Sequence, residues 1–208
     1  MERLPLFPLP IVLLPGAPMP LHIFEPRYRQ MVARCVEGDG RFGLVYHDPD
    51  REGPFHADEA RVGTVARITR YEPLPDGRSL IMCRGEERFV IREEVEGGAP
   101  YYEAVVTPYE DEAAPDPRLP ARRRQTIALF HRVLREAMSS PPPHPHLDPG
   151  REVAFRVAHT IRIDPAWQQR LLETRSERER LEQIDELLRS VLEAHARGEW
   201  SPQPEEEE

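Results

Sequence analysis

Hydrophobic residues near the start of the chain form two short runs that are bracketed by prolines. The runs span residues 11–14 and 21–24, and the first ends in a Pro-Gly turn signal. The second ends just before Pro26, and proline suits the first position of a helix because its missing N–H would be unpaired there. Apolar residues then recur at helical spacing, at Tyr28, Met31, Val32 and Cys35. Gly38 stops this pattern, which therefore predicts strand, turn, strand and helix.

Further along, short apolar runs alternate with turn signals, which is typical of strands. We expect strands at 42–47, 61–71, 79–84, 88–95 and 101–108. The segment 72–77 reads Glu-Pro-Leu-Pro-Asp-Gly, the kind of sequence that closes a hairpin. Several strands so close together, with a single helix among them, favour a small barrel or sandwich.

Beyond an acidic, proline-containing connector at 111–117, the hydrophobic period changes from two to about three and a half. We expect helices within 127–137, 148–161, 164–172 and 176–198. The last one opens at Ser176 with a capping box, in which Ser and Glu satisfy each other's backbone N–H. The predicted class is α+β, with a disordered acidic tail at 198–208 that has nothing to bury.

Composition is typical of a globular protein: 39% of the 208 residues are hydrophobic, and no apolar run reaches 18 residues. We therefore expect neither a membrane span nor a signal peptide, and a cytoplasmic location. The two cysteines, Cys35 and Cys83, form no C-x-x-C motif, so apolar packing is the favoured interpretation for both.

The charge pattern argues against nucleic acid as a partner. The net charge is −9, and residues 1–118 carry 14 Arg against 21 acidic residues. Phosphate binding normally rests on a basic field, and the one basic cluster, 122–124, is interpreted as a solvated helix face. All 28 basic residues are Arg, so these 208 residues cannot perform chemistry that requires a lysine side chain.

Two groups of residues deserve comparison with catalytic and metal sites. His22 and Cys35 could form a nucleophile pair oriented by Glu25, but a strand histidine and a cysteine on the apolar face of the next helix favour packing. His144 and His146 could bind a metal with Asp148, but alternate histidines in a proline-rich loop favour a solvated linker. We expect no catalytic residue, no metal and no cofactor.

Four motifs in sequence order resemble the N-terminal domain of Lon proteases. They are an LPLFPL-like segment at 4–9, V-x-x-P-G at 12–16, P-L-x-I-F at 20–24 and E-x-R-Y at 25–28. Similar segments continue through the strands at 62–68, 74–77 and 84–89, and through the helices at 170–173, 180–182 and 187–188. The resemblance covers about residues 3 to 195.

The resemblance implies a PUA-like β-barrel at 1–116 followed by a helical bundle at 117–197. It also implies a bacterial protein that recognises substrates for ATP-dependent proteolysis. The ATPase module of full-length Lon proteases needs a Gly-Lys-Ser/Thr loop and the peptidase needs a Ser-Lys pair, and neither can be formed without lysine. The expected function is therefore non-catalytic: binding of unfolded or tagged protein segments, as an adaptor or regulator of a separate protease.

Two other functions stay open at this point: a small-molecule-binding module of the same barrel type, and an RNA- or DNA-binding protein. For peptide binding, the candidate residues by location near turns and element ends are Phe24, Tyr28, Tyr71 and Leu74. Phe24 and Tyr28 could instead anchor the helix to the barrel, and Leu74 could be only a hairpin tip. We expect a monomer or a dimer.

Overall fold

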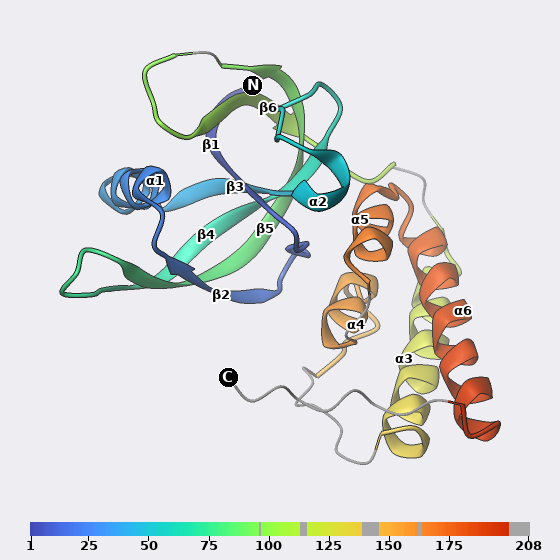
Figure 1. The fold of residues 1–208 in the computed structure, drawn as a ribbon. Coiled ribbons are helices and arrows are strands. Elements are labelled where there is room, and N and C mark those ends of the chain that lie inside the picture. The colour runs from blue at the N-terminus through green and yellow to red at the C-terminus, as the bar shows by residue number, and fades with distance from the viewer. Residues whose placement is uncertain (96, 113–115, 139–145, 162–163, 200–208) are drawn as a thin grey trace. The chain divides into compact units, whose positions relative to one another are not determined.

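A computed structural model describes residues 1–95, 97–112, 116–138, 146–161 and 164–199 of the chain. The chain divides into two units with dense internal contacts. The first consists of Met1–Glu110 and Ile163–Glu173, and the second of Asp111–Arg162 and Thr174–Glu208. Strands occupy the first unit and helices dominate the second, which confirms the α+β class (Figure 1).

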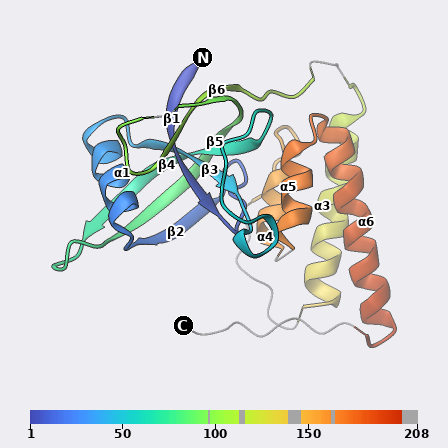
Figure 2. The ribbon, with the colours of Figure 1, turned by 45° about the horizontal axis from the view of Figure 1, so that its top comes forward.

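Six strands form one sheet in the first unit. They are β1 (Glu2–Leu9), β2 (Pro18–Ile23), β3 (Arg41–Tyr46), β4 (Val62–Pro73), β5 (Ser79–Glu94) and β6 (Tyr102–Pro108). The strand order is β2-β5-β4-β3-β1-β6, and β6 also pairs with β5. This extra pairing closes five strands into a barrel and leaves β2 as an additional strand on β5 (Figure 2). The β1–β3 pair is parallel and the other pairs are antiparallel.

The first strand, β1, was not predicted from the hydrophobic pattern, because Pro5 and Pro8 interrupt its sequence. Its first half pairs with β6 and its second half with β3. Each half therefore has one paired side only, which leaves room for residues that lack an N–H donor.

Two expectations about strands were wrong. Residues 11–14 are not a strand but an irregular segment with three buried side chains, and the separate strands expected at 79–84 and 88–95 are one strand, β5. The two differences meet at Gly85. Gly85 lies where the irregular segment crosses β5, and a Cβ there would stand 2.3 Å from the carbonyl oxygen of Leu14. Glycine thus marks a close backbone approach rather than a break between strands.

Apolar residues from all five barrel strands fill the interior, together with two from the segment after the short helix α2 (Pro49–Glu52). The members of this core are Leu4, Leu6, Val45, Phe55, Ala57, Val65, Phe89, Ile91, Ala104 and Val106. A second apolar layer lies under α1 (Pro26–Glu37), where the rings of Phe7 and Tyr28 are 4.1 Å apart. The predicted helix start at Pro26 and stop at Gly38 are confirmed.

The helix α5 (Pro165–Glu173) belongs to the barrel unit although it follows other helices in sequence. Gln169 donates to the carbonyl of Val62 in β4 (3.1 Å). At the other end of the helix, the guanidinium of Arg88 donates to the carbonyl of Leu172 (2.6 Å), and the Tyr109 hydroxyl donates to that of Glu173 (2.9 Å). These two bonds satisfy carbonyls that a helix C-terminus leaves without an intrahelical donor.

The second unit contains α3 (Leu119–Glu136), α4 (Ala154–Thr160) and α6 (Glu177–Ala196). The helices α3 and α6 lie side by side and are joined by a buried hydrogen bond from Thr126 to Asp185 (2.6 Å). Ser176 caps α6 as predicted, accepting from the Glu179 N–H. The helix α4 begins later than expected, because Asp148 accepts the Gly150 N–H in a turn instead of starting the helix.

Candidate functional site

The four residues proposed for peptide binding all lie in the barrel unit but differ in exposure. Phe24 follows β2 directly and is 58% exposed, whereas Tyr28 is buried against Phe7. Tyr71 is exposed near the end of β4, and Leu74 is partly buried at the hairpin tip, where its N–H donates to the Arg78 carbonyl. Three of the four thus have side chains that a ligand could reach.

An exposed apolar face runs across β2 and β5 beside Phe24. In β5, burial alternates: Ser79, Ile81 and Cys83 are buried, whereas Leu80 is 44% exposed. Leu80 lies opposite His22 of β2 on one side and Glu72 of β4 on the other. We define the apolar face as Pro20, His22, Phe24, Leu80 and Met82.

The register of the strands places these five side chains on the same side of the sheet. Pro20 pairs with Met82 and His22 with Leu80, two residues apart along each strand. Phe24 extends the row, and its ring centroid is 5.7 Å from that of His22. The face therefore offers two large apolar side chains, Phe24 and Leu80, with a histidine between them.

The sequence did not single out Leu80. It lies in an uninterrupted apolar run, Leu-Ile-Met-Cys, in which periodicity cannot say which side faces solvent. The position of Leu80 on the exposed side is decided by α1, which covers the other side of the sheet. Burial beside Cys35 of that helix raises the pKa of Cys83 to about 12.

The residues considered for nucleophilic catalysis are not assembled into a site. The side chain of His22 belongs to the exposed apolar face, whereas Cys35 is buried in α1, and burial raises the pKa of its thiol to about 11. Glu25 pairs with Arg27 (2.9 Å). A nucleophilic cysteine needs a lowered pKa and a nearby base, and this geometry supplies neither.

The histidine loop gives no metal geometry in the described residues. His144 lies outside them, His146 is exposed, and the Asp148 carboxylate accepts from the Gly150 N–H. More broadly, within the described ranges no group of three or more His, Cys, Asp or Glu side chains is placed to hold a metal ion.

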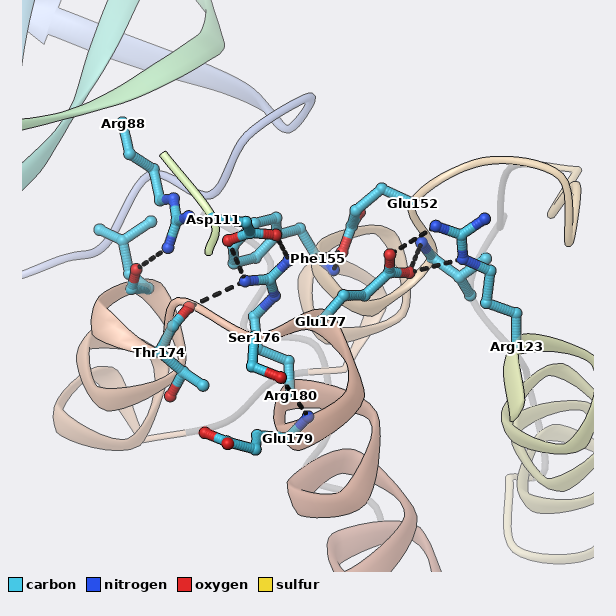
Figure 3. Close-up of polar contacts among 12 residues, drawn as sticks. Arg88, Asp111, Arg123, Glu152, Phe155, Thr174, Ser176, Glu177, Glu179 and Arg180 are labelled. Carbon is cyan, nitrogen blue, oxygen red and sulfur yellow. Dashed lines mark hydrogen bonds and ion pairs between the residues drawn. The ribbon is translucent and has the colours of Figure 1, made fainter. Parts of the chain in front are cut away.

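A cluster of charged side chains, several of them buried, lies in the helical unit (Figure 3). Arg180 is buried and donates to both oxygens of Asp111 (2.7 and 2.6 Å) and to the Thr174 carbonyl (2.8 Å). Its guanidinium also lies 4.4 Å from the ring centroid of Phe155. Because Asp111 and Thr174 open the two segments of this unit, Arg180 ties the segments together.

Glu152 in the same cluster has an unusual titration. Burial raises its pKa to about 7, against the lowering effects of the Phe155 N–H and of Arg180, whose guanidinium is 3.8 Å away. Nearby, Arg123 and Glu177 form a two-pronged ion pair. All these charges are engaged with one another, so the cluster connects segments of the unit and leaves no side chain turned to a reactive role.

No helix in the described part of the chain combines the length and the apolar character that crossing a membrane requires.

Comparison with known proteins gives Lon proteases among the relatives of this chain. A Lon protease of Cytophaga hutchinsonii is 30% identical over 154 residues, which cover 73% of this chain and 18% of that protein. A Lon protease of Xanthomonas oryzae pv. oryzae is 30% identical over 188 residues, covering 86% of this chain and 22% of that protein. The chain thus spans less than a quarter of the length of these two relatives.

The name of a third relative gives a RING finger in addition to a LON N-terminal domain. A LON peptidase N-terminal domain and RING finger protein of Schizosaccharomyces pombe is 36% identical over 94 residues, covering 39% of this chain and 19% of that protein.

Two solved structures share the fold. A Lon N-terminal domain protein from Xanthomonas campestris has a TM-score of 0.66 at 25% identity and covers 88% of this chain and 97% of its own. The N-terminal domain of the Mycobacterium avium complex Lon protease has a TM-score of 0.66 at 17% identity, covering 90% and 98%. A family model described as the ATP-dependent protease La (LON) substrate-binding domain matches residues 3–190. The chain therefore belongs to the family of Lon substrate-binding domains, as its N-terminal motifs predicted.

Proposed function

We propose that this chain is a recognition domain that binds unfolded polypeptide segments on the apolar face and hydrolyses nothing itself. The observation that carries the proposal is the exposure of Phe24 and Leu80 in one row on a rigid sheet. Large apolar side chains gathered on a surface mark an interaction site more reliably than isolated ones do. Unfolded chains expose apolar side chains that folded proteins bury, so this face distinguishes the two.

The size of the face suits weak and reversible capture. Fully burying a Phe or Leu side chain stabilises a complex by about 1.5 to 3 kcal/mol. Phe24 and Leu80 together therefore supply a few kcal/mol, from which the cost of ordering the bound segment is subtracted. A domain that must hand its substrate on benefits from such modest affinity.

Capture by side chains is favoured over addition of a strand to the sheet edge. Gly85 of β5 donates its N–H to the carbonyl of Ala17 (2.9 Å). The backbone N–H and C=O groups of the odd-numbered residues of β2 therefore point toward β5, and those of the even-numbered residues point away from the sheet. Pro18 and Pro20 are even-numbered and have no N–H. The outer edge of β2 can donate through His22 alone, which disfavours pairing with another chain along this strand.

The charges beside the apolar face suit a polypeptide better than a nucleic acid. On β4, the nearest charged pair is Arg70 with Glu72 (3.2 Å), which neutralise each other. Arg84 of β5 adds one further exposed cation beyond Met82, and two arginines with one glutamate are not the basic field that phosphate backbones require.

We further propose that cleavage of the bound segment is the task of a separate machine, for which this chain acts as adaptor or regulator. Within these 208 residues there is no lysine, so neither the lysine of a nucleotide-binding P-loop nor that of a Ser-Lys peptidase is present. The S. pombe relative supports the idea by its name, which sets a LON N-terminal domain beside a RING finger.

A binding assay with matched variants tests the proposal. Fluorescence anisotropy would follow a labelled, reduced and carboxymethylated protein that cannot fold, with its native disulfide-bonded form as the comparison. Phe24→Ser and Leu80→Ser should each weaken binding of the unfolded form by about tenfold, since each loses roughly 1.4 kcal/mol or more of apolar burial. Binding of the native form should be negligible.

The control is Val36→Ser on α1. Val36 is 41% exposed, close to the value for Leu80, but it lies away from the apolar face. It should bind unfolded protein as the original chain does. Equal affinities for all three variants would overturn the assignment of this face.

A further inference from the structure

A solvent-open cavity lies in the barrel unit where β1, α1 and the loop before β6 meet. Its volume is about 530 Å³, and its polar lining includes Arg3 of β1, Gln30 and Arg34 of α1, and Glu103 of β6. The cavity contains none of the residues of the apolar face, so it requires an explanation of its own.

The carboxylate of Glu103 is held from two sides. It is 2% exposed, and its Oε2 accepts from Arg3 (2.5 Å) while its Oε1 accepts from Arg34 (3.1 Å). The same Arg34 nitrogen donates to the Tyr101 hydroxyl (2.9 Å). Burial of a charge is costly unless it is paired, which explains one arginine. One guanidinium is enough to neutralise one carboxylate, so the second leaves a surplus positive charge among the described groups of the cavity.

Both arginines keep donors available to a ligand. Their side chains are 52% and 61% exposed despite the bonds to Glu103. A guanidinium carries five N–H donors, and the bonds named above engage one nitrogen of each side chain. The free donors border the cavity from two different elements.

Two glycines without side chains also line the cavity. Gly97 and Gly98 have φ angles of 134° and 53°, a region in which glycine is favoured, and nothing lies within 4 Å of where a Cβ would stand at either position. The loop therefore allows a small ligand to approach its peptide groups, as bulkier residues would not.

We propose that this cavity binds a single carboxylate group, held by the free donors of Arg3 and Arg34 beside the loop at 97–100. A planar carboxylate matches the guanidinium fork, and a single negative charge matches the surplus of one positive charge. A dianionic phosphate would face the buried carboxylate of Glu103 with excess negative charge. The carboxylate arrives either on a small organic acid or as the terminal carboxylate of a bound polypeptide.

The first experiment uses acetate and no polypeptide, so its outcome is separate from the function proposed for the apolar face. Sodium acetate is titrated into the protein at constant ionic strength, with chloride as the balancing anion, and the backbone amide resonances of Gly97, Gly98 and Ala99 are followed. Saturable shifts in the millimolar range are expected with acetate and not with chloride. Equal responses to the two anions would overturn the proposal.

Variants locate the site. Arg3→Gln removes the surplus charge but leaves Glu103 paired with Arg34, and it should weaken acetate binding by about tenfold, the loss expected for one charge-assisted hydrogen bond. Arg34→Gln removes the surplus charge from the other side and leaves Glu103 paired with Arg3, so it should weaken acetate binding similarly. Arg29→Gln removes the same charge from α1 outside the cavity and serves as the control. If Arg3→Gln and Arg29→Gln bind acetate equally, the assignment is wrong.

Two peptides of the same sequence distinguish the sources of the carboxylate. One carries a free C-terminus and the other a C-terminal amide, and neither contains Asp or Glu. Tighter binding of the free acid than of the amide, lost in Arg3→Gln, assigns the cavity to polypeptide termini. Equal binding of the two peptides, with acetate still bound, assigns it to small organic acids.

Discussion

Gly85 illustrates how a single absent side chain determines the path of two segments. A Cβ at this position would lie 2.3 Å from the carbonyl oxygen of Leu14, which is backbone and cannot rotate away. We predict that Gly85→Ala destabilises the protein by about 1 to 3 kcal/mol, the usual cost of overpacking. Urea unfolding measures this cost.

Gly38→Ala is the matched substitution for Gly85→Ala. Gly38 has φ −98° and ψ −128°, which cost alanine some backbone strain, but the nearest atom to a Cβ there is 3.4 Å away, so the effect should be smaller than that of Gly85→Ala. If the two variants unfold at the same urea concentration, the close approach to Leu14 is not the reason why glycine is needed at position 85.

Glu152 should give the helical unit a distinct dependence of stability on pH. Burial raises its pKa from the ordinary 4.5 to about 7, so between these values the folded state binds more protons than the unfolded state. Stability should therefore fall as pH rises through this interval. Glu152→Gln should remove this fall and gain about 1 kcal/mol at pH 8, an amount reduced for the partial exposure of the side chain.

Thermal unfolding at pH 4.5 and pH 8 measures this difference. Glu179→Gln on α6 is the control, because its side chain is exposed. If Glu152→Gln stabilises the protein more at pH 4.5 than at pH 8, the assigned direction of the Glu152 pKa shift is wrong.

Among the elements, those with a clear beginning and end were predictable from the sequence. The proline at the start of α1 and the glycine after it fixed both ends, and the Ser176 cap placed α6. Strand β1 was not predictable from periodicity because its two prolines are tolerated by pairings that only the assembled sheet supplies. The same limit applies to the apolar face: whether Leu80 or Ile81 points to solvent depends on which side α1 covers.

The position of α5 leads to a prediction that separates the two units. Leu171 is fully buried, and α5 is bonded to β4 through Gln169. Leu171→Ala should cost about 2 to 5 kcal/mol and should speed hydrogen exchange in the barrel strands β4 and β5. Faster exchange in α3 and α6 with unchanged strands would show instead that α5 stabilises the helical unit.

The molecule as a whole was predictable in class but not in how its parts are assembled. Strand-rich and helix-rich stretches follow from the change of period near residue 111. Periodicity could not show that α5 returns to the barrel, because the helix is held by bonds to Arg88 and Tyr109, far away in sequence. The cavity at Glu103 was missed for a similar reason: its two arginines are 31 residues apart and meet only through the packing of α1 beside β1.

The absence of lysine from these 208 residues leads to a prediction about their enzymatic activity. Purified to remove other proteases, the protein should neither hydrolyse ATP nor cleave unfolded casein, because neither reaction has its usual lysine in these 208 residues. Turnover of either substrate in proportion to the concentration of this protein would contradict the account.

The central claim is that unfolded polypeptide is bound by the apolar face of the barrel unit. Mapping backbone amide resonances on addition of a reduced, carboxymethylated protein tests it most directly. The account predicts shifts or broadening in β2, Phe24 and the first half of β5, with α3 and α6 unchanged. Changes confined to α3 and α6, or none at all, would contradict it.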